Sequence, residues 1–429
     1  MLFKNIAILD ENYEIKENRY VGTEKDKIAY IGTETPETDF GEVYDGKNKL
    51  LMPAFFNAHA HSPMMLMRGY GENLTLQDWL NTRIFPFEDK LTSEAVYYAT
   101  LLAMAESLRF GIVSSSDMYY FCDDMVRAVE ESGAKANISR SITSFAEGSV
   151  KNNDSYREAE ALIRDYHGAA EGRILIDASI HAEYTNTVTS ITEVADLAKK
   201  YGVNMHVHVS ETKQEHEECK ARHGGRTPAQ LLCDLGAFDT RTTAAHCVWA
   251  EEEDIEIFSE KGVTVATCPV SNLKLASGVC NVPALMKKGV NVAVGTDSVA
   301  SNNSLNFIEE MKFFALLNKE RRNDPTLITP KETLRAAARA GALSQGREDC
   351  GVLAVGRKAD LTVLDIGQPH MRPVHNLANN IVYSASGSDV VLTMADGRVL
   401  YRDGDFFTID VEKAAAETER ACRDILRQL

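Results

Sequence analysis

Histidine and acidic residues stand at the ends of several apolar, strand-like segments of the sequence. His59 and His61 are two residues apart, so on a strand their side chains point to the same face. Three neutral imidazoles and a carboxylate suit a catalytic zinc ion that keeps one position open for water. The pattern therefore predicts a metal centre drawn from the residues at the segment ends: His59, His61, His181, His208, His246 and Asp297.

One of these segments, VNMHVHVSE at 203–211, offers two histidines for the same role. His206 and His208 share a strand face, so either could be the ligand. His208 lies nearer to the end of the strand and three residues before Glu211, and this spacing favours His208. A lone histidine at a strand end is more often a surface or hydrogen-bonded residue. The recurrence at five segments is what points to a metal.

These side chains need a fold that gathers strand ends at one face. Between residues 54 and 351, eight strand-like segments alternate with helical patterns such as SEAVYYATLLAMAESLRF and ITEVADLAKKYG. Repeated β–α alternation predicts an α/β fold with a parallel sheet, and eight units are what a (β/α)8 TIM barrel requires. An open doubly wound sheet would also explain the alternation, but no Gly-rich phosphate-binding turn favours it. In a barrel, the active site lies at the C-terminal ends of the strands.

The two ends of the chain show short alternating strands separated by Gly and Asp turns, as in LFKNIAILD and VVLTMADGRVLYRDG. Neither end is long enough to enclose a core alone. We therefore expect residues 1–53 and 352–410 to form one composite β domain, a small β-sandwich, beside a catalytic barrel of residues 54–351. Residues 411–429 predict an amphipathic C-terminal helix.

Composition narrows the classes of partner. The 429 residues include 46 Lys and Arg against 63 Asp and Glu, a net charge of −17, and no basic run is longer than a pair. An acidic surface of this kind predicts no binding to nucleic acid or to anionic membranes. No apolar stretch of about 18 residues and no signal sequence is evident, which favours a cytoplasmic location. The 8 cysteines include no CxxC pair, so a cysteine-based zinc or redox motif is not expected.

Five stretches carry a resemblance to a known family. They are NAHAHSPMMLMRGYGENLTLQDWL, HVHVSET, AAHCVW, CPVSNLKLASG and GTDSVASNNSLNFIEEMK. They resemble the amidohydrolase superfamily, specifically its mononuclear aminohydrolase branch, and the resemblance extends over essentially the whole chain. It implies a distorted TIM barrel that binds one divalent metal ion per subunit, zinc in preference to iron. The implied ligands are His59, His61, His208 and Asp297, with His246 and Glu211 catalytic rather than ligating.

The residues themselves support a single metal ion. Binuclear members of the superfamily bridge two ions with a carboxylated lysine or a glutamate at the end of an early or middle strand. The segment RILIDASIHAEY at 173–184 contains no lysine. Glu183, two residues after His181, is the remaining candidate for a bridge, and we expect a mononuclear centre.

The implied reaction is hydrolytic deamination of a heteroaromatic ring. A divalent metal lowers the pKa of a bound water from about 15.7 towards about 7. Asp297 and His246 would hold that water and accept its proton, while Glu211 would carry a proton to a ring nitrogen. The amino group then leaves as ammonia, and a carbonyl takes its place.

The stretch WLNTRIFPFE at 79–88 is similar to a loop of methylthioadenosine/S-adenosylhomocysteine deaminases. In that loop the tryptophan packs on the ligand and the glutamate accepts hydrogen bonds from the ribose hydroxyls, a task that suits a carboxylate. The implied substrate is a 5′-modified adenosine, which becomes an inosine. Arg140 would reach the ligand of a neighbouring subunit, so a homo-oligomer, a dimer or a tetramer, is expected. The implied substrate contacts are Trp79, Glu88, Arg140, His181 and Glu211.

At one position the sequence departs from that family. Relatives that use S-adenosylhomocysteine offer a second arginine a dozen or so residues after the first, to meet the amino-acid carboxylate. Here the stretch AEGSVKNNDS supplies only Lys151. A lysine is a point charge rather than a bidentate fork. We therefore expect 5′-methylthioadenosine, 5′-deoxyadenosine or adenosine to be used better than S-adenosylhomocysteine.

Other functions fit the same metal set. A deaminase of guanine, cytosine or a pterin, or a triazine hydrolase, would share it, and only Trp79 and Glu88 argue against these. Taken alone, Trp79 would be a buried aromatic residue and Glu88 an acid at the start of a helix. A non-catalytic metal-binding barrel is the remaining alternative. Glu211 and His246 argue against it, because a purely ligating site does not need them.

Overall fold

The barrel strands are short apolar runs that are covered on both sides. In the computed structural model, which describes residues 1–429, every residue of β11 (Met205–Val209) and β12 (Thr242–His246) is buried. Parallel strands packed between a barrel interior and a layer of helices have this pattern. The other barrel strands are β6 (Phe55–Ala60), β7 (Ile112–Tyr119), β8 (Lys135–Arg140), β9 (Ile174–Ile176), β10 (Ala178–Ala182), β13 (Thr264–Thr267) and β14 (Asn291–Val294).

Two parallel sheets make up the barrel, with the strand orders β6-β7-β8-β9 and β10-β11-β12-β13-β14. Single parallel bridges join them at both seams, Ile142 with Ile180 and Ala60 with Asp297. β9 and β10 come from one sequence segment that breaks at Asp177. The result is a closed but distorted (β/α)8 barrel, which confirms the predicted fold class. The second seam matters for the site, because the backbone N–H of Asp297 donates to the carbonyl of His59 at 3.0 Å.

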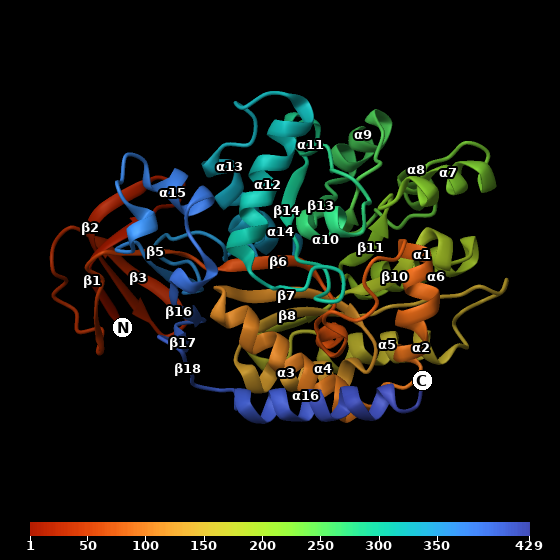
Figure 1. Ribbon diagram of the computed structural model, residues 1–429, viewed down its shortest axis with the longest axis horizontal. Helices are drawn as coiled ribbons and strands as arrows, with labels where there is room; N and C mark the ends of the chain where they lie inside the picture. The colour runs from red at the N-terminus through yellow and green to blue at the C-terminus, as the bar shows by residue number, and fades with distance from the viewer.

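Helices cover the outside of the barrel (Figure 1). α3 (Ser93–Arg109) begins at Thr92, whose side chain accepts from the backbone N–H of Ala95, and α6 (Val188–Tyr201) ends at Gly202 in the left-handed conformation. These are the two helical patterns that the sequence shows most clearly. The others are α4 (Cys122–Ser132), α5 (Asp154–Tyr166), α7 (Lys213–Arg222), α8 (Pro228–Asp234), α9 (Glu252–Lys261), α10 (Pro269–Lys274), α11 (Val282–Lys287), α12 (Phe307–Arg322), α13 (Pro330–Arg335) and α14 (Gly341–Ser344).

A helical insertion follows β6 before the chain enters α3. It consists of a 3-10 turn (Ser62–Met67), α1 (Leu76–Trp79), a π-helical turn (Leu80–Ile84) and α2 (Phe85–Glu88). The side chain of Thr75 caps α1 by accepting from the backbone N–H of Asp78. Residues of this insertion line the pocket at the C-terminal ends of the barrel strands, so the insertion forms one wall of the site.

Strands from both chain ends form one sheet beside the barrel (Figure 1), with the order β18-β17-β16-β15-β5-β1-β2-β3 and with β4 against β1. The two ends meet where β15 (Leu361–Asp365) runs antiparallel to β5 (Lys49–Pro53). The sheet folds over a separate core of 12 buried residues, and this is the sandwich expected from the chain ends. The other strands are β1 (Leu2–Leu9), β2 (Ile15–Glu24), β3 (Lys27–Gly32), β4 (Val43–Asp45), β16 (Val390–Ala395), β17 (Arg398–Arg402) and β18 (Asp405–Phe406).

A buried lysine ties this sheet to the barrel. Lys135, at the start of β8, lies 2.6 Å from Asp360 and 2.8 Å from Asp396, which flank β15 and β16.

Between β15 and β16, α15 (Leu377–Tyr383) packs on α12 and α13, and after β18 α16 (Val411–Leu426) lies along α3 (Figure 1). None of the helices combines the length and apolar character needed to span a bilayer. The division of the chain at residues 54, 352 and 411 stays a prediction.

Candidate active site

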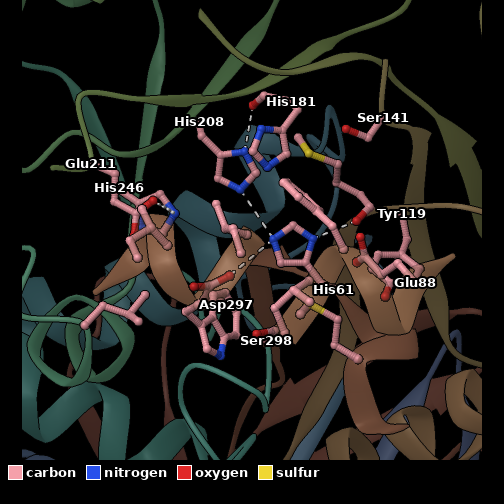
Figure 2. Close-up of a pocket in the computed structure, with 18 of the residues that line it drawn as sticks. His61, Glu88, Tyr119, Ser141, His181, His208, Glu211, His246, Asp297 and Ser298 are labelled. Carbon is pink, nitrogen blue, oxygen red and sulfur yellow. Dashed lines mark hydrogen bonds and ion pairs between the residues drawn. The ribbon is translucent and has the colours of Figure 1, made fainter. Parts of the chain in front are cut away.

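A pocket opens at the C-terminal ends of the barrel strands (Figure 2). Apolar side chains of the insertion after β6 line one wall, among them Leu76, Trp79, Leu80, Ile84 and Phe85. The pocket therefore has an apolar wall and a densely polar one, the latter formed by His61, His181, His208, Glu211, His246 and Asp297.

His59 lies fully buried behind these polar residues. Its Nε2 atom has no hydrogen-bond partner. Nitrogen atoms of His59, His61 and His208 lie within 4.8 Å of one another, and so do the ligand atoms of His59, His246 and Asp297. A buried nitrogen without a partner is costly, and a cation between these groups would satisfy it. Three imidazoles and a carboxylate are a zinc donor set. The residues therefore fit the divalent metal ion that the sequence predicts.

Hydrogen bonds on the far side of each ring orient the imidazoles. His61 Nδ1 lies 2.7 Å from the carbonyl of Met118, and His208 Nδ1 lies 2.7 Å from the carbonyl of His181. A carbonyl only accepts, so each Nδ1 carries a proton and each Nε2 is the nitrogen that can bind a metal ion once it is deprotonated. Both Nε2 atoms face the cluster, 3.4 Å from each other.

The structure separates the two histidines of β11. His206 Nε2 lies 2.9 Å from His59 Nδ1, behind the ring of His59 and away from the pocket. His208 lines the pocket instead. His206 thus holds His59 in place, and the choice of His208 as the ligand agrees with its position in the site.

Asp297 joins the cluster through one carboxylate oxygen. Its Oδ1 atom lies 3.2 Å from His61 Nε2 and 3.5 Å from His59 Nε2. Burial opposes the charge of Asp297, but the neighbouring imidazoles hold its pKa well below the usual range. Burial likewise disfavours a charged His61, yet Asp297 raises the pKa of that imidazole to about 9. For His59 burial dominates and lowers the pKa to about 3.

Glu211 and His246 form a pair beside the cluster, with Glu211 Oε2 3.8 Å from His246 Nε2. His246 Nδ1 lies 2.9 Å from Asn272 Oδ1, which leaves Nε2 free to face the pocket. Burial raises the pKa of Glu211, against the opposing effect of His246. Glu215 accepts hydrogen bonds from the backbone N–H of Ser210 and Glu211 and so fixes the turn that carries Glu211. A buried carboxyl next to an imidazole suits proton transfer.

The profile of the amidohydrolase family matches residues 50–400. The chain belongs to the amidohydrolase family. A 5-methylthioadenosine/S-adenosylhomocysteine deaminase of Caldanaerobacter subterraneus subsp. tengcongensis is 40% identical over 429 residues, covering 100% of this chain and 99% of the relative. A 5′-deoxyadenosine deaminase of Methanosarcina mazei is 39% identical over 432 residues, with coverage of 100% and 99%. The crystal structure of an adenosine deaminase from Xanthomonas campestris with bound zinc has a TM-score of 0.93 at 30% identity and covers 100% of this chain and 98% of its own.

In this amidohydrolase, four of the five predicted substrate contacts line the pocket, namely Trp79, Glu88, His181 and Glu211. Glu88 ends α2 beside Tyr119, across the pocket from Glu211 (Figure 2). Burial raises the pKa of Glu88 to about 7, although Tyr119 and His61 oppose the shift. Burial also lowers the pKa of His181 to about 4, so this imidazole is neutral at physiological pH.

Two predicted cations do not reach the pocket of their own chain. Arg140 Nε lies 2.7 Å from Glu158, and the guanidinium stacks 4.8 Å above the ring of Tyr120. Lys151 lies 3.9 Å from Glu193, with 54% of its side chain exposed. Neither lines the pocket.

Glu183, the candidate for a second-metal bridge, points to α7 rather than into the cluster. Its oxygens lie 2.6 Å from Arg222 and 2.9 Å from His223.

Sequence reasoning missed Tyr119 and Ser141, which line the pocket from the ends of β7 and β8. Both could have been found, because they close strand-like segments as the histidines do.

Proposed function

We propose that this protein is a metal-dependent deaminase that hydrolyses the amino group from the adenine ring of 5′-modified adenosines, giving the inosine product and ammonia. The observation that carries the proposal is the position of Glu211 and His246 beside a His/His/His/Asp cluster, in a pocket that also presents Glu88. The names of the relatives at 40% and 39% identity, deaminases of 5-methylthioadenosine/S-adenosylhomocysteine and of 5′-deoxyadenosine, support it.

One divalent ion, zinc in preference to iron, would be held by His59, His61, His208 and Asp297. When bound, such an ion lowers the pKa of a coordinated water to about 7, which makes a nucleophile available at neutral pH. The zinc in the solved adenosine deaminase from Xanthomonas campestris supports this choice of metal.

Side chains of the protein carry out the proton transfers. Glu211, whose pKa is raised by burial, donates a proton to a ring nitrogen and so makes the adjacent carbon electrophilic. His246 Nε2, left free by the contact of Nδ1 with Asn272, accepts a proton from the attacking water together with Asp297. A second transfer to the amino group lets ammonia leave and a carbonyl form.

The two ends of the pocket orient the nucleoside. Glu88 lies apart from the Glu211 end (Figure 2), so a ribose held at Glu88 directs the adenine ring towards Glu211. A carboxylate accepts strong hydrogen bonds from two vicinal hydroxyls. Leu76, Trp79 and Phe85 would pack on the nucleoside and exclude water from it.

The 5′ substituent meets no free cation of the same chain. Lys151 faces Glu193, and Arg140 is held by Glu158. We therefore expect weak use of a substrate that carries an amino-acid carboxylate. We also propose that the protein is a homo-oligomer in which Arg140 contacts the ligand of a neighbouring subunit, and that it is cytoplasmic.

A nucleoside panel tests the function. Ammonia release from the zinc-loaded protein is measured with 5′-methylthioadenosine, 5′-deoxyadenosine, adenosine and S-adenosylhomocysteine, beside guanine, cytosine, a pterin and a triazine. We expect the first three compounds to give the highest kcat/KM, and chelator-treated protein to be inactive. A higher kcat/KM for any of the other heterocycles contradicts the proposed substrate class, and a preference for S-adenosylhomocysteine contradicts the argument from Lys151.

A further inference from the structure

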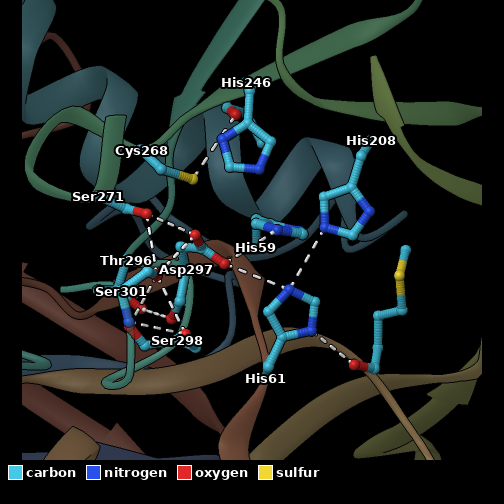
Figure 3. Close-up of polar contacts among 12 residues, drawn as sticks. His59, His61, His208, His246, Cys268, Ser271, Thr296, Asp297, Ser298 and Ser301 are labelled. Carbon is cyan, nitrogen blue, oxygen red and sulfur yellow. Dashed lines mark hydrogen bonds and ion pairs between the residues drawn. The ribbon is translucent and has the colours of Figure 1, made fainter. Parts of the chain in front are cut away.

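The two carboxylate oxygens of Asp297 have different surroundings (Figure 3). Oδ1 faces the Nε2 atoms of His61 and His59 at 3.2 and 3.5 Å. Oδ2 turns the other way and accepts hydrogen bonds from two serine hydroxyls, Ser271 Oγ at 2.5 Å and Ser301 Oγ at 2.9 Å. One oxygen is therefore available to a metal, and the other is taken by the protein.

The hydrogens of this group can be counted. Each serine hydroxyl has one hydrogen, and an ionised carboxylate only accepts. Ser298 Oγ lies 3.0 Å from Ser301 Oγ, so Ser298 can donate to Ser301. The hydrogen of Ser301 can reach the carbonyl of Ser298 at 3.2 Å or Asp297 Oδ2 at 2.9 Å, and the charged carboxylate is the nearer and stronger acceptor. Ser271 is within reach of both Ser301 and Asp297, and the charged acceptor makes the stronger bond. Two hydrogens therefore converge on Oδ2.

These groups are shielded from bulk water. Ser271, Ser301 and Asp297 have relative exposures of 0%, 2% and 6%. The donors come from two separate elements, Ser271 from α10 after β13 and Ser301 from the loop after β14. The next residue of α10, Asn272, contacts His246, so this short helix holds both Asp297 and His246.

We propose that Ser271 and Ser301 are positioning residues for the metal centre. By holding Oδ2, they turn Oδ1 towards the cluster, so that Asp297 would offer a bound divalent ion one oxygen rather than two. Three imidazoles and one carboxylate oxygen would leave room for the water that the reaction consumes. The inference rests on the proposed metal site. It assigns the orientation of the Asp297 carboxylate to the two serine hydroxyls.

The test compares Ser271→Ala, Ser301→Ala and the double variant with Ser301→Thr, which keeps the hydroxyl. Ser132→Ala is the matched control, because Ser132 is equally buried but donates to Val129 within α4. Three quantities are measured: zinc affinity by chelator competition, the visible spectrum of the Co(II)-substituted protein, and kcat and KM for the best nucleoside. The spectrum reports the coordination number of the metal.

We expect the double variant to lose about 10- to 100-fold in zinc affinity or in kcat, the usual effect of removing a partner of a metal ligand. Its Co(II) spectrum should change, and KM should stay within about threefold, since the hydroxyls do not line the pocket. Each single variant should lose less than the double variant, because one donor remains. Ser301→Thr and Ser132→Ala should match the parent protein.

Two results overturn the inference. The first is a double variant with the zinc affinity and Co(II) spectrum of the parent. The second is a Ser301→Thr variant that loses as much as Ser301→Ala. If the double variant does not fold, the single variants decide by the same criteria. Zinc affinity and the Co(II) spectrum need no substrate, so they remain decisive even if the proposed nucleosides are not turned over.

Discussion

The charge of Glu88 should control how well the protein distinguishes a ribose from a sugar without hydroxyls. Burial raises the pKa of Glu88 to about 7, so the carboxylate loses its charge as the pH falls through this value. The ionised group accepts hydrogen bonds from both vicinal hydroxyls, whereas the protonated group is a weaker acceptor. Preference for adenosine over 2′,3′-dideoxyadenosine should therefore be nearly full above about pH 8 and decline as the pH falls through the pKa of Glu88.

The size of the effect follows from the pKa. For a single group with a pKa of about 7, the ionised fraction falls about tenfold between about pH 8 and about pH 6. Hydrogen bonds to a charged group contribute about 1.5–3 kcal/mol, which corresponds to about 10- to 100-fold in kcat/KM. The ratio of kcat/KM for the two nucleosides should therefore drop about 5- to 10-fold between about pH 8 and about pH 6 and level off near about pH 5. Titration of the metal-bound water or of Glu211 affects both substrates and cancels in the ratio.

The assay is ammonia release with both nucleosides between about pH 5 and about pH 9. Glu88→Gln keeps the shape of the side chain but cannot titrate, so its ratio should be low and independent of pH. Asp89→Asn, at the exposed neighbouring residue, should keep a pH-dependent ratio with its midpoint moved to lower pH, because the charge of Asp89 helps to raise the pKa of Glu88. A flat ratio in the parent, or a pH dependence that survives in Glu88→Gln, would refute the assignment of Glu88 to the ribose.

Three further predictions concern the metal, the proton transfer and the fold. Elemental analysis should find about one zinc or iron per chain, with His208→Ala losing the metal and His206→Ala retaining it; two ions per chain, both needed for activity, would contradict the mononuclear centre. Glu211→Gln should keep the metal but lose at least about 100-fold in kcat, and turnover within a few-fold of the parent would exclude a proton shuttle. Lys135→Met leaves Asp360 buried without its cation and should lower the free energy of unfolding by about 3–5 kcal/mol, measured by urea unfolding, whereas Lys135→Met with Asp360→Asn should recover part of this loss.

The barrel strands could be predicted because parallel strands buried on both faces are continuous apolar runs. The histidine and acidic residues stand at the C-terminal ends of these segments. Since the strand ends of a parallel barrel meet at one face, this placement indicated which side chains lie close together. The structure brings His59, His61, His208 and Asp297 together as expected. Spacing from Glu211 also selected His208 over His206, and the two occupy different positions in the site.

Other contacts around the site could not be predicted from a local sequence pattern. The contact of Ser271 and Ser301 with Asp297 joins residues on different elements, and neither serine closes a strand. The ion pairs of Arg140 with Glu158 and of Lys151 with Glu193 depend on helices that follow later in the sequence. Spacing alone could not indicate that these cations are already paired.

The sequence by itself determined the element order and the face of each strand that carries histidine or carboxylate, because periodicity and spacing act over a few residues. The family followed from the resemblance of five stretches of the sequence to known members. Only the tertiary structure decided how the barrel closes, with Ala60 bridged to Asp297, and which oxygen of Asp297 faces the cluster. These depend on packing between segments more than 200 residues apart, as in the hydrogen bond from Asn57 to Thr296, where the separation is 239 residues. No pattern within one segment specifies such a contact, because its geometry is set by all the elements that close the barrel.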